Sequence, residues 1–568
     1  MAKPRPLLAA LALALSACSP SPAPESFSAL SEEFVFGSLA LSPVAATSTG
    51  YHQHKGQNLD SLLDDLSQPG LDRQRRFYQS FRDRLARVPL DQLSGDDRAD
   101  YDILSDQIAW SLLELDEIQQ WRHNPTIYVE LIGTALFDPH VLDYAPRPQR
   151  LRHIIARLEK IPAFLAPARK NLAASPDIWT AVAAEENEGN ITLIDKVIRA
   201  SLTEEVRADY DRAAQPALAA LRAFQDFLKN DLAGRNQWDW RLGPEKYARK
   251  FRYALATDRR PDQVLAAAER DLQAVRARMA ELAKGDVAQA LDRIARRHAT
   301  PDTYISDARR DLEEARRFIQ EKQFLPLPPR DNLQVIETPE FMRGIYAVGG
   351  FKSAPALEPQ LGAFYWLTPI PKDWPQPRIE SKLREYNFYK LKLLTIHEAM
   401  PGHYVQLEWA NDLQPATRRL VRAVFGNGPY IEGWGQYSTQ LMLDEGFLNN
   451  SPELRLTFLK EELRVLANAI LDIRLHTSGL TDQQALDLME QQTYQEKEEA
   501  TAKLRRAKLS SCQLPTYYVG WRDWIRVREH YQHSKGAAYQ LADFNERALK
   551  AGAVPLPVLA RLLTGKPL

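Results

Sequence analysis

Cysteine is nearly absent from this sequence, since only Cys18 and Cys512 occur among 568 residues. Cys18 lies in a predicted processing site at the start of the chain, which leaves Cys512 without an intrachain partner. We therefore expect a fold that is held together without disulfides. Cys512 is best interpreted as a small buried apolar side chain. Because it lies next to Gln513 and near Tyr517, contact with a functional site is the alternative.

Excess charge of either sign is also missing, because 73 Lys and Arg residues balance 74 Asp and Glu residues. The net charge of -1 provides no global field that would attract nucleic acid, so nucleic acid is not an expected partner. The composition is 44% hydrophobic and includes 11 Trp and 37 Pro. This composition allows a large core and favours a folded chain with many separate helices.

The chain begins with an apolar segment that is too short to be a permanent membrane span. A positively charged start precedes a run of Leu and Ala at residues 7–15, and a Leu-Ser-Ala-Cys box follows. The box resembles a bacterial lipoprotein signal, which implies cleavage before Cys18 and lipid on its thiol and new amino terminus. Ser19 implies sorting to the outer membrane, facing the periplasm, with residues 18–26 as a tether. The alternative is a plain secretory signal in which Cys18 is incidental.

Helical periodicity dominates residues 27–325. Apolar side chains recur every three or four positions, and several of these stretches begin just after Pro, Asp or Thr. We expect helices over residues 98–118, 148–172, 213–232, 261–283 and 301–323, the second of them interrupted at Pro162 and Pro167. These helices are predicted to form a domain that encloses a deep central cleft, beside a catalytic domain over residues 326–568.

Ionisable residues are concentrated in the segment at 394–406, which reads LTIHEAMPGHYVQ. His397, Glu398 and His403 lie within seven residues, after a run at 386–396 that is typical of a buried helix. Buried ionisable side chains are costly unless a cation takes their lone pairs. A His followed by Glu and then by a second His on one helix is typical of zinc peptidases. In these enzymes the two His bind the metal and the Glu acts as general base.

The spacing between the two histidines departs from that pattern. In the standard motif the second His follows four residues later, about 40° away around the helix, whereas a six-residue interval gives roughly 120°. Pro401 and Gly402 favour a break or bulge that would bring His403 back beside His397. The alternative is a helix that ends at Met400, with His403 in an ordinary turn.

With Gln406 just beyond it, this segment resembles the signature of the bacterial domain-of-unknown-function family 885. Its pattern is His-Glu-x-x-Pro-Gly-His, and the family is regarded as related to zinc metallopeptidases of the Glu-zincin type. Three further segments resemble motifs of this family. Residues 432–437 (EGWGQY) resemble its Glu-Gly-Trp-Ala-x-Tyr, and residues 472–477 (DIRLHT) resemble its Asp-x-Gly-x-His-Thr. Residues 513–520 (QLPTYYVG) resemble its Gln-Ala-x-x-Tyr-x-x-Gly. The sequence departs from the family at Arg474, where Gly is usual, and at Ser511-Cys512, where Pro-Gly is usual. The likeness covers nearly all of the mature chain and is specific after about residue 390.

A third metal ligand is needed, because a catalytic zinc typically takes three protein ligands and leaves one position for water. By spacing alone, Glu408, Glu432 and Glu445 all compete for this role. The family resemblance selects Glu432, which would lie on an antiparallel helix returning after His403.

Two more sites carry candidate roles. Asp472 and His476 lie four residues apart on one helical face, so they could orient a ligand, or His476 could stabilise an oxyanion. A buried pair with a structural role is the alternative. The spacing to Gln513 favours Tyr517 over Tyr518 as an oxyanion donor.

Between residues 326 and 371 short alternating apolar segments predict a small sheet. Strands are expected at 333–336, 344–348 and 362–369. Because extended peptides can add to a sheet edge, the last strand is a candidate edge for substrate, and a purely structural sheet is the alternative. The predicted fold class is mainly α, with a small sheet beside a zincin-like active-site helix.

These patterns together predict a zinc-dependent hydrolase that acts on short peptides. The expected roles are metal binding by His397, His403 and Glu432, catalysis by Glu398, Tyr517 and His476, substrate binding by Tyr365, Asp472 and Arg522, and membrane attachment through Cys18. A non-catalytic peptide-binding lipoprotein is an alternative. A non-haem iron enzyme is another, although such an enzyme would not need the base adjacent to the first His. The two histidines at 52 and 54 are candidates for a second metal site, but a surface loop is the simpler interpretation.

Overall fold

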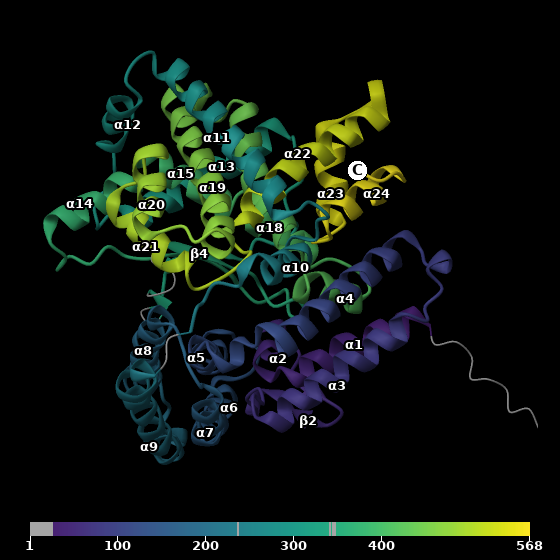
Figure 1. Ribbon diagram of the computed structural model, residues 1–568, viewed down its shortest axis with the longest axis vertical. Helices are drawn as coiled ribbons and strands as arrows, with labels where there is room; N and C mark the ends of the chain where they lie inside the picture. The colour runs from purple at the N-terminus through teal and green to yellow at the C-terminus, as the bar shows by residue number, and fades with distance from the viewer. Residues whose placement is uncertain (1–25, 236–237, 340–341, 344–347) are drawn as a thin grey trace, which may run out of the picture.

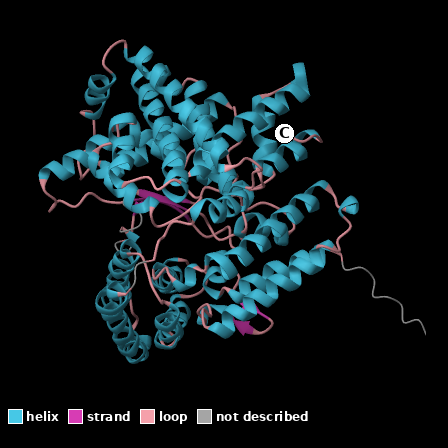
Figure 2. Ribbon diagram, in the orientation of Figure 1, coloured by secondary structure: helices cyan, strands magenta, loops and turns pink. Residues whose placement is uncertain are grey.

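The computed structural model describes residues 26–235, 238–339, 342–343 and 348–568. Within these ranges the protein is mainly helical, with two small sheets (Figures 1 and 2). The helices before the second sheet are α1 (Phe27–Leu41), α2 (Pro43–Thr49), α3 (Gln68–Leu85), α4 (Gly95–Leu113), α5 (Thr126–Val141), α6 (Arg147–Leu158), α7 (Ile161–Asn171), α8 (Asp177–Thr192), α9 (Glu204–Asp226), α10 (Gly243–Leu255), α11 (Pro261–Ala283), α12 (Val287–Ala295) and α13 (Tyr304–Lys322).

The helices after the second sheet are α14 (Gln376–Glu385), α15 (Phe388–Glu398), α16 (His403–Ala410), α17 (Ala416–Val424), α18 (Gly428–Asp444), α19 (Pro452–Thr477), α20 (Asp482–Asp487), α21 (Lys497–Ala507), α22 (Pro515–Lys535), α23 (Leu541–Lys550) and α24 (Leu556–Thr564). The mainly α fold class is therefore confirmed. The interruption predicted at Pro162 within residues 148–172 is confirmed, because α6 ends before it and Pro162 lies in the first turn of α7. The interruption predicted at Pro167 is wrong, since Pro167 lies inside α7.

Two strands near the N-terminus, β1 (Gln53–His54) and β2 (Gln57–Asn58), form a short antiparallel hairpin. The second sheet has the order β3-β5-β4, from β3 (Leu333–Glu337), β4 (Gly349–Lys352) and β5 (Ala363–Leu367). β3 is parallel to β5, with Val335 opposite Tyr365, and β4 is antiparallel to it, with Phe351 opposite Tyr365.

The predicted strands at 333–336 and 362–369 are confirmed, but the prediction that the latter forms a sheet edge is wrong. β5 is hydrogen-bonded on both sides, so its backbone has no free edge to offer a peptide. In the described part of the chain, β4 and β3 are the outer strands. Most of the strand predicted at 344–348 falls outside the described residues.

The three-stranded sheet lies between two hydrophobic cores. The larger core joins α1, α10, α11 and α13 to α15, α18, α19 and α22, and the smaller one is formed mainly by α5 to α9. Successive residues of β5 alternate between them: Tyr365 packs into the larger core, whereas Phe364 and Trp366 face the smaller one. Figure 1 shows the strands between an upper group of green and yellow helices and the lower blue helices.

The larger core also runs across the domain boundary predicted near residue 325. Leu312 and Phe324 belong to it together with Tyr365 and Ile396, so the helical wall and the candidate site share one packed interior. In the described residues, no helix is both long enough and apolar enough to cross a bilayer. The predicted lipidation site at Cys18 lies outside the described residues.

Candidate metal centre

The two histidines of the central motif lie on separate helices. α15 ends at Glu398, and α16 begins at His403. The intervening chain contains a cis Met400–Pro401 peptide bond and folds back against the end of α15. A Cβ atom on Gly402 would lie 1.7 Å from the carbonyl oxygen of His397, so only glycine fits there. The predicted break is therefore present, and His403 starts a new helix rather than lying in a simple turn.

α18 holds this turn in place. The indole N–H of Trp434 lies 2.9 Å from the carbonyl oxygen of Pro401 and 3.1 Å from that of Gly402. The indole is fully buried, so these contacts are shielded from water. Trp434 therefore ties the backbone between the two histidines to the helix that carries Glu432.

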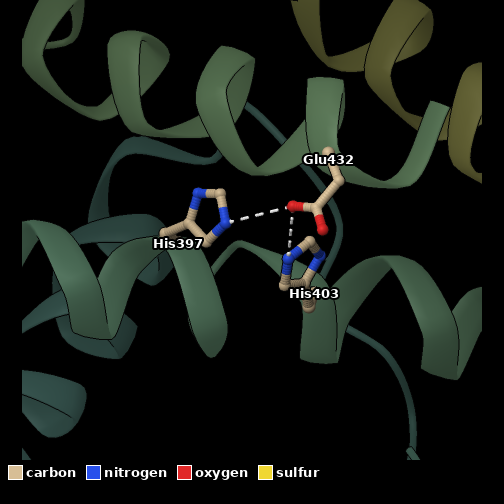
Figure 3. Close-up of side chains that lie close together, drawn as sticks. All are labelled: His397, His403 and Glu432. Atoms are coloured by element: carbon tan, nitrogen blue, oxygen red, sulfur yellow. Dashed lines mark ion pairs between the residues drawn. The ribbon is translucent and has the colours of Figure 1, made fainter. Parts of the chain in front are cut away.

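His397, His403 and Glu432 converge on one point (Figure 3). The Oε2 atom of Glu432 lies 3.5 Å from Nε2 of His397 and 3.4 Å from Nε2 of His403. Two ligand atoms about 2.1 Å from one tetrahedral ion are about 3.4 Å apart, so these separations fit a shared zinc ion. Each of the three side chains offers one ligand atom, and these atoms all lie within 4.8 Å of one another. In the described part of the chain, no other cluster of three His, Cys, Asp or Glu side chains is arranged so that it could hold an ion.

The electrostatics of the three side chains also fit a cation. Burial raises the pKa of Glu432, but the adjacent imidazoles of His397 and His403 lower it far below its ordinary value. Burial lowers the pKa of His403, whereas the carboxylates of Glu432 and Glu398 raise it above its ordinary value. Within the described part of the chain, Oε2 of Glu432 accepts no hydrogen bond and Nδ1 of His403 has no partner. A buried carboxylate oxygen that lacks a donor is stabilised when a cation binds it.

Two further residues of α18 shape the position of His397. The side-chain nitrogen of Gln436 lies 3.4 Å from Nδ1 of His397. A Cβ atom on Gly435, where the family pattern has Ala, would lie 2.5 Å from Cε1 of His397. Neither role was predicted from the sequence, and nor was that of Trp434. For Gln436 a signal was available, because it follows Glu432 by one helical turn and so lies on the same face.

Glu398 and Tyr517 lie near the three converging side chains. The charge of Glu398 contributes to the raised pKa of His403 and of Tyr517. The ring of Tyr517 stacks beside that of His397, with 6.3 Å between centroids and 21° between planes. Burial raises the pKa of Tyr517 well above its ordinary value, so the phenol stays protonated and can donate. The hydroxyl of Tyr518 instead donates to Asp271 at 2.9 Å.

Asp472 and His476 hold the loop that precedes α22. Oδ1 of Asp472 accepts from the backbone N–H of Cys512 at 3.0 Å, and Nε2 of His476 lies 3.1 Å from the carbonyl oxygen of Ser510. Nδ1 of His476 faces the backbone N–H of Leu242 at 3.3 Å. Both ring nitrogens are thus engaged with backbone groups, which does not fit the oxyanion role or the substrate contact predicted for this pair. Instead the two residues position the segment leading to Tyr517.

Cys512 occupies an unusual backbone position in this loop. Its φ of 63° lies in the left-handed region, where the glycine that is usual in the family would be unstrained. Its side chain is a free, buried thiol with 1% exposure. The interpretation of Cys512 as a small buried apolar residue is therefore confirmed.

Other predicted residues lie away from the three ligands. Tyr365 is fully buried, and its hydroxyl is 3.3 Å from that of Thr395 on α15, which does not fit a substrate contact. Arg522 lies on the exposed side of α22, 3.6 Å from Asp271. Glu408, which competed with Glu432 by spacing, forms an ion pair with Arg330 at 2.6 Å.

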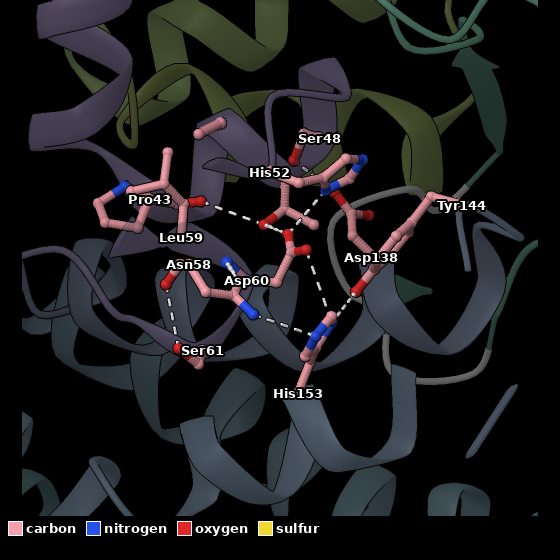
Figure 4. Close-up of polar contacts among 12 residues, drawn as sticks. Pro43, Ser48, His52, Asn58, Leu59, Asp60, Ser61, Asp138, Tyr144 and His153 are labelled. Atoms are coloured by element: carbon pink, nitrogen blue, oxygen red, sulfur yellow. Dashed lines mark hydrogen bonds and ion pairs between the residues drawn. The ribbon is translucent and has the colours of Figure 1, made fainter. Parts of the chain in front are cut away.

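His52 belongs to a polar cluster in which residues of the N-terminal segment meet Asp138 of α5 and His153 of α6 (Figure 4). Its Nδ1 lies 2.9 Å from Asp60 and its Nε2 lies 3.2 Å from Glu358. Burial lowers the pKa of His52, but these two carboxylates raise it to about 9. His52 is therefore a protonated partner of two carboxylates, and in the described residues it does not form a second metal site with His54.

A Trp434→Phe variant tests whether the indole positions the ligands. Phe keeps most of the packing but removes the N–H that holds the turn at Pro401 and Gly402. We expect the affinity for zinc to fall roughly 10–100-fold, as for other residues that support metal ligands, with little change in helicity. Competition with a chromophoric chelator measures this affinity. Trp524→Phe is the matched control, because its buried indole bonds to the carbonyl oxygen of Tyr430 at 2.9 Å instead. An equal loss in both variants would contradict a specific role for Trp434.

The fold and this site define a mainly α protein with a candidate His/His/Glu metal centre. Residues 43–563 match the family described as "Bacterial protein of unknown function (DUF885)", and the chain belongs to this family. No curated protein matches the sequence.

Two solved structures are similar over nearly their whole length. One carries the description "putative lipoprotein of unknown function" and comes from Shewanella oneidensis; its TM-score is 0.79 at 28% identity, covering 95% of this chain and 99% of the other. The other, described as the "putative lipoprotein" from Colwellia psychrerythraea, has a TM-score of 0.79 at 18% identity, covering 95% and 98%. The second likeness concerns the fold alone.

Proposed function

We propose that this protein is a zinc-dependent hydrolase that cleaves short peptides. The observation that carries the proposal is the convergence of His397, His403 and Glu432 at separations that suit one tetrahedral ion, with Glu398 adjacent to the first ligand. A zinc ion bound there would polarise a carbonyl group and lower the pKa of its bound water to about 7.

The remaining steps belong to side chains of this chain. Glu398 accepts the proton of the attacking water and passes it to the leaving amine. Tyr517, which is protonated and lies beside His397, donates a hydrogen bond to the oxygen on which negative charge develops. The loss of one such donor costs about 3–4 kcal/mol of transition-state stabilisation.

The outer strand β4 is the proposed place for the peptide backbone. Its residue Phe351 contacts the rings of His403 and Tyr404, with centroid distances of 6.5 Å and 6.3 Å. An extended peptide paired with β4 would therefore pass beside the first turn of α16. In this proposal β4 replaces β5 as the strand that pairs with substrate.

We also propose that the protein is a cell-envelope lipoprotein, tethered through lipid on Cys18 to the outer membrane and facing the periplasm. The Leu-Ser-Ala-Cys box supports this location, as does the lipoprotein description of the similar structure from Shewanella oneidensis.

Metal removal and restoration test the proposed activity. Purified protein is expected to contain one zinc ion per chain and to cleave a pool of quenched short peptides. A chelator should abolish cleavage, and added zinc should restore it, whereas heat-treated protein with zinc serves as the control. Cleavage that persists in the fully metal-free protein would contradict the proposal. Iron as the resident metal, with no hydrolysis, would favour the non-haem iron alternative, and peptide binding without turnover would favour a binding protein.

A further inference from the structure

A cavity borders α18 and α22, the two helices that also carry Glu432 and Tyr517. It has a volume of about 520 Å³ and is lined by residues of α11, α18, α19 and α22, helices that pack against one another in the upper half of Figure 1. We call it the distal pocket. Its volume falls in the range of ordinary ligand sites, about 300–1,000 Å³.

A line of accessible side chains on α18 leads from the metal centre to this pocket. From Glu432 to the end of the helix, every fourth residue is accessible and all the others are buried; the accessible ones are Glu432, Gln436, Gln440 and Asp444. Glu432 is a candidate ligand and Gln436 contacts His397, whereas Gln440 and Asp444 line the distal pocket. The accessible stripe of α18, which turns about 40° around the helix at each four-residue step, therefore runs from one site to the other.

The neighbouring helix repeats this arrangement. Tyr517, Trp521 and Ile525 follow each other at four-residue intervals on α22, with Tyr517 beside His397 and the other two lining the distal pocket. The indole N–H of Trp521 donates to Oε1 of Gln440 at 2.8 Å, which joins the two lines of side chains. The metal centre and the distal pocket thus lie at two points along one α18–α22 surface.

The spacing of the two sites suits a peptide. Glu432 and Gln440 are eight residues apart on α18, which corresponds to about 12 Å along the helix axis. An extended peptide covers about 3.3–3.6 Å per residue. A substrate residue in the distal pocket would therefore be three or four residues from the bond at the metal centre.

The lining of the distal pocket indicates which residue it takes. Phe458, Leu459 and Trp521 are 5%, 6% and 2% exposed and form an apolar floor. The charged lining residues comprise four cations and three anions, namely Arg278, Lys284, Arg455 and Arg522 with Glu281, Asp444 and Glu462. Arg278 pairs with Glu462 at 2.6 Å. Arg455 lies 3.6 Å from Asp444, and Arg522 lies 3.6 Å from Asp271, which is outside the lining. An apolar floor beside two loosely paired guanidinium groups, those of Arg455 and Arg522, suits a bulky apolar group that is next to a carboxylate.

We propose that the distal pocket is a substrate subsite that binds a bulky apolar residue of the peptide and an adjacent carboxylate, three or four residues from the cleaved bond. The carboxylate is either an acidic side chain or the free C-terminus. This inference rests on the proposed peptidase function and adds to it a substrate class and a minimum length.

Peptide series test the subsite. All the quenched peptides share one cleaved bond. Each carries Phe-Glu, Phe-Gln or Gly-Gln at a distance of three or four residues from that bond, on its N-terminal or its C-terminal side. Each is made with a C-terminal carboxylate and with a C-terminal amide. Phe-Glu is expected to raise kcat/KM roughly tenfold or more over Gly-Gln on one side only, because a Phe side chain leaves water. The carboxylate and amide arms distinguish an acidic side chain from the C-terminus. An absence of any preference would overturn the proposal.

Two variants locate that preference in the pocket. Leu282→Trp fills the pocket from the partly exposed end of α11, and Arg522→Gln removes one of its two loosely paired guanidinium groups. We expect the first to abolish the preference for Phe and the second to reduce only the preference for the carboxylate. Arg526→Gln on the same helix lies outside the pocket lining and is the matched control. An unchanged preference for Phe in Leu282→Trp would overturn the subsite.

Binding measurements separate this inference from the proposed chemistry. Fluorescence anisotropy of the same peptides with metal-stripped protein reports the pocket without turnover. One possible result is that peptide binding weakens roughly tenfold in Leu282→Trp although the wild-type protein hydrolyses no peptide. This result would support the pocket and contradict the hydrolase. Hydrolysis with no effect of Leu282→Trp on binding or rate would support the hydrolase and overturn the pocket.

Discussion

A Glu398→Gln variant is expected to keep its zinc and to lose kcat for peptide cleavage by roughly 10²–10⁴-fold, the usual contribution of a general base. Gln has nearly the same shape as Glu but cannot accept the proton of the attacking water. Glu398 is the last residue of α15 and is not one of the three converging ligands, so its replacement leaves His397, His403 and Glu432 in place. Steady-state kinetics at saturating peptide measure kcat, and metal analysis of the same sample measures zinc.

Glu445→Gln is the matched control for this variant. Glu445 lies at the C-terminal end of α18 and was a competing ligand by spacing alone, but it does not belong to the converging group. Its replacement should change neither zinc content nor rate. A Glu398→Gln protein that retains the full rate would show that the base is elsewhere. One that loses its zinc would show that Glu398 binds the metal.

A His403→Ala variant is expected to lose zinc and, with it, the stabilisation that zinc provides. In the wild type, free zinc at 100 times Kd should raise the free energy of unfolding by about 2.7 kcal/mol, because the ion binds only the folded state. In the variant only His397 and Glu432 remain on the ion, so this gain should disappear at the same zinc concentration. Chemical denaturation with and without zinc measures the difference.

His533→Ala provides the control for His403→Ala. His533 is an exposed residue on α22, and its Nδ1 contacts the carbonyl oxygen of Glu529 within the same helix. This variant should keep the full zinc-dependent gain. If His403→Ala kept the gain as well, His403 would not be a ligand, and the proposed centre would be wrong.

The Pro-Gly break shows what a local pattern can establish. Pro401 cannot continue a helix and Gly402 accepts a close backbone contact, so the sequence predicted an interruption between the two histidines. The structure has that interruption, with α15 ending before it and α16 beginning at His403. The resemblance to the family then selected Glu432 over Glu408, which the structure places in an ion pair with Arg330.

The sheet and the Asp472/His476 pair show where a local pattern does not suffice. The alternation of residues 362–369 predicted a strand, but strand order depends on pairing between distant segments, and β5 proved central. Similarly, the four-residue spacing of Asp472 and His476 placed them on one face of a helix without revealing what lies opposite. Their partners, Cys512, Ser510 and Leu242, come from two separate segments of the chain.

The sequence by itself determined the helical character of the chain, the break in the central motif and the residue types suited to a metal, because each depends on neighbours within a few positions. Only the tertiary structure decided which strand is outermost and that Trp434 holds the turn. It alone also placed Gln436 beside His397 and brought the distal pocket onto the same surface of α18 and α22. These features arise from packing between residues that are far apart in the chain, and no local propensity encodes them.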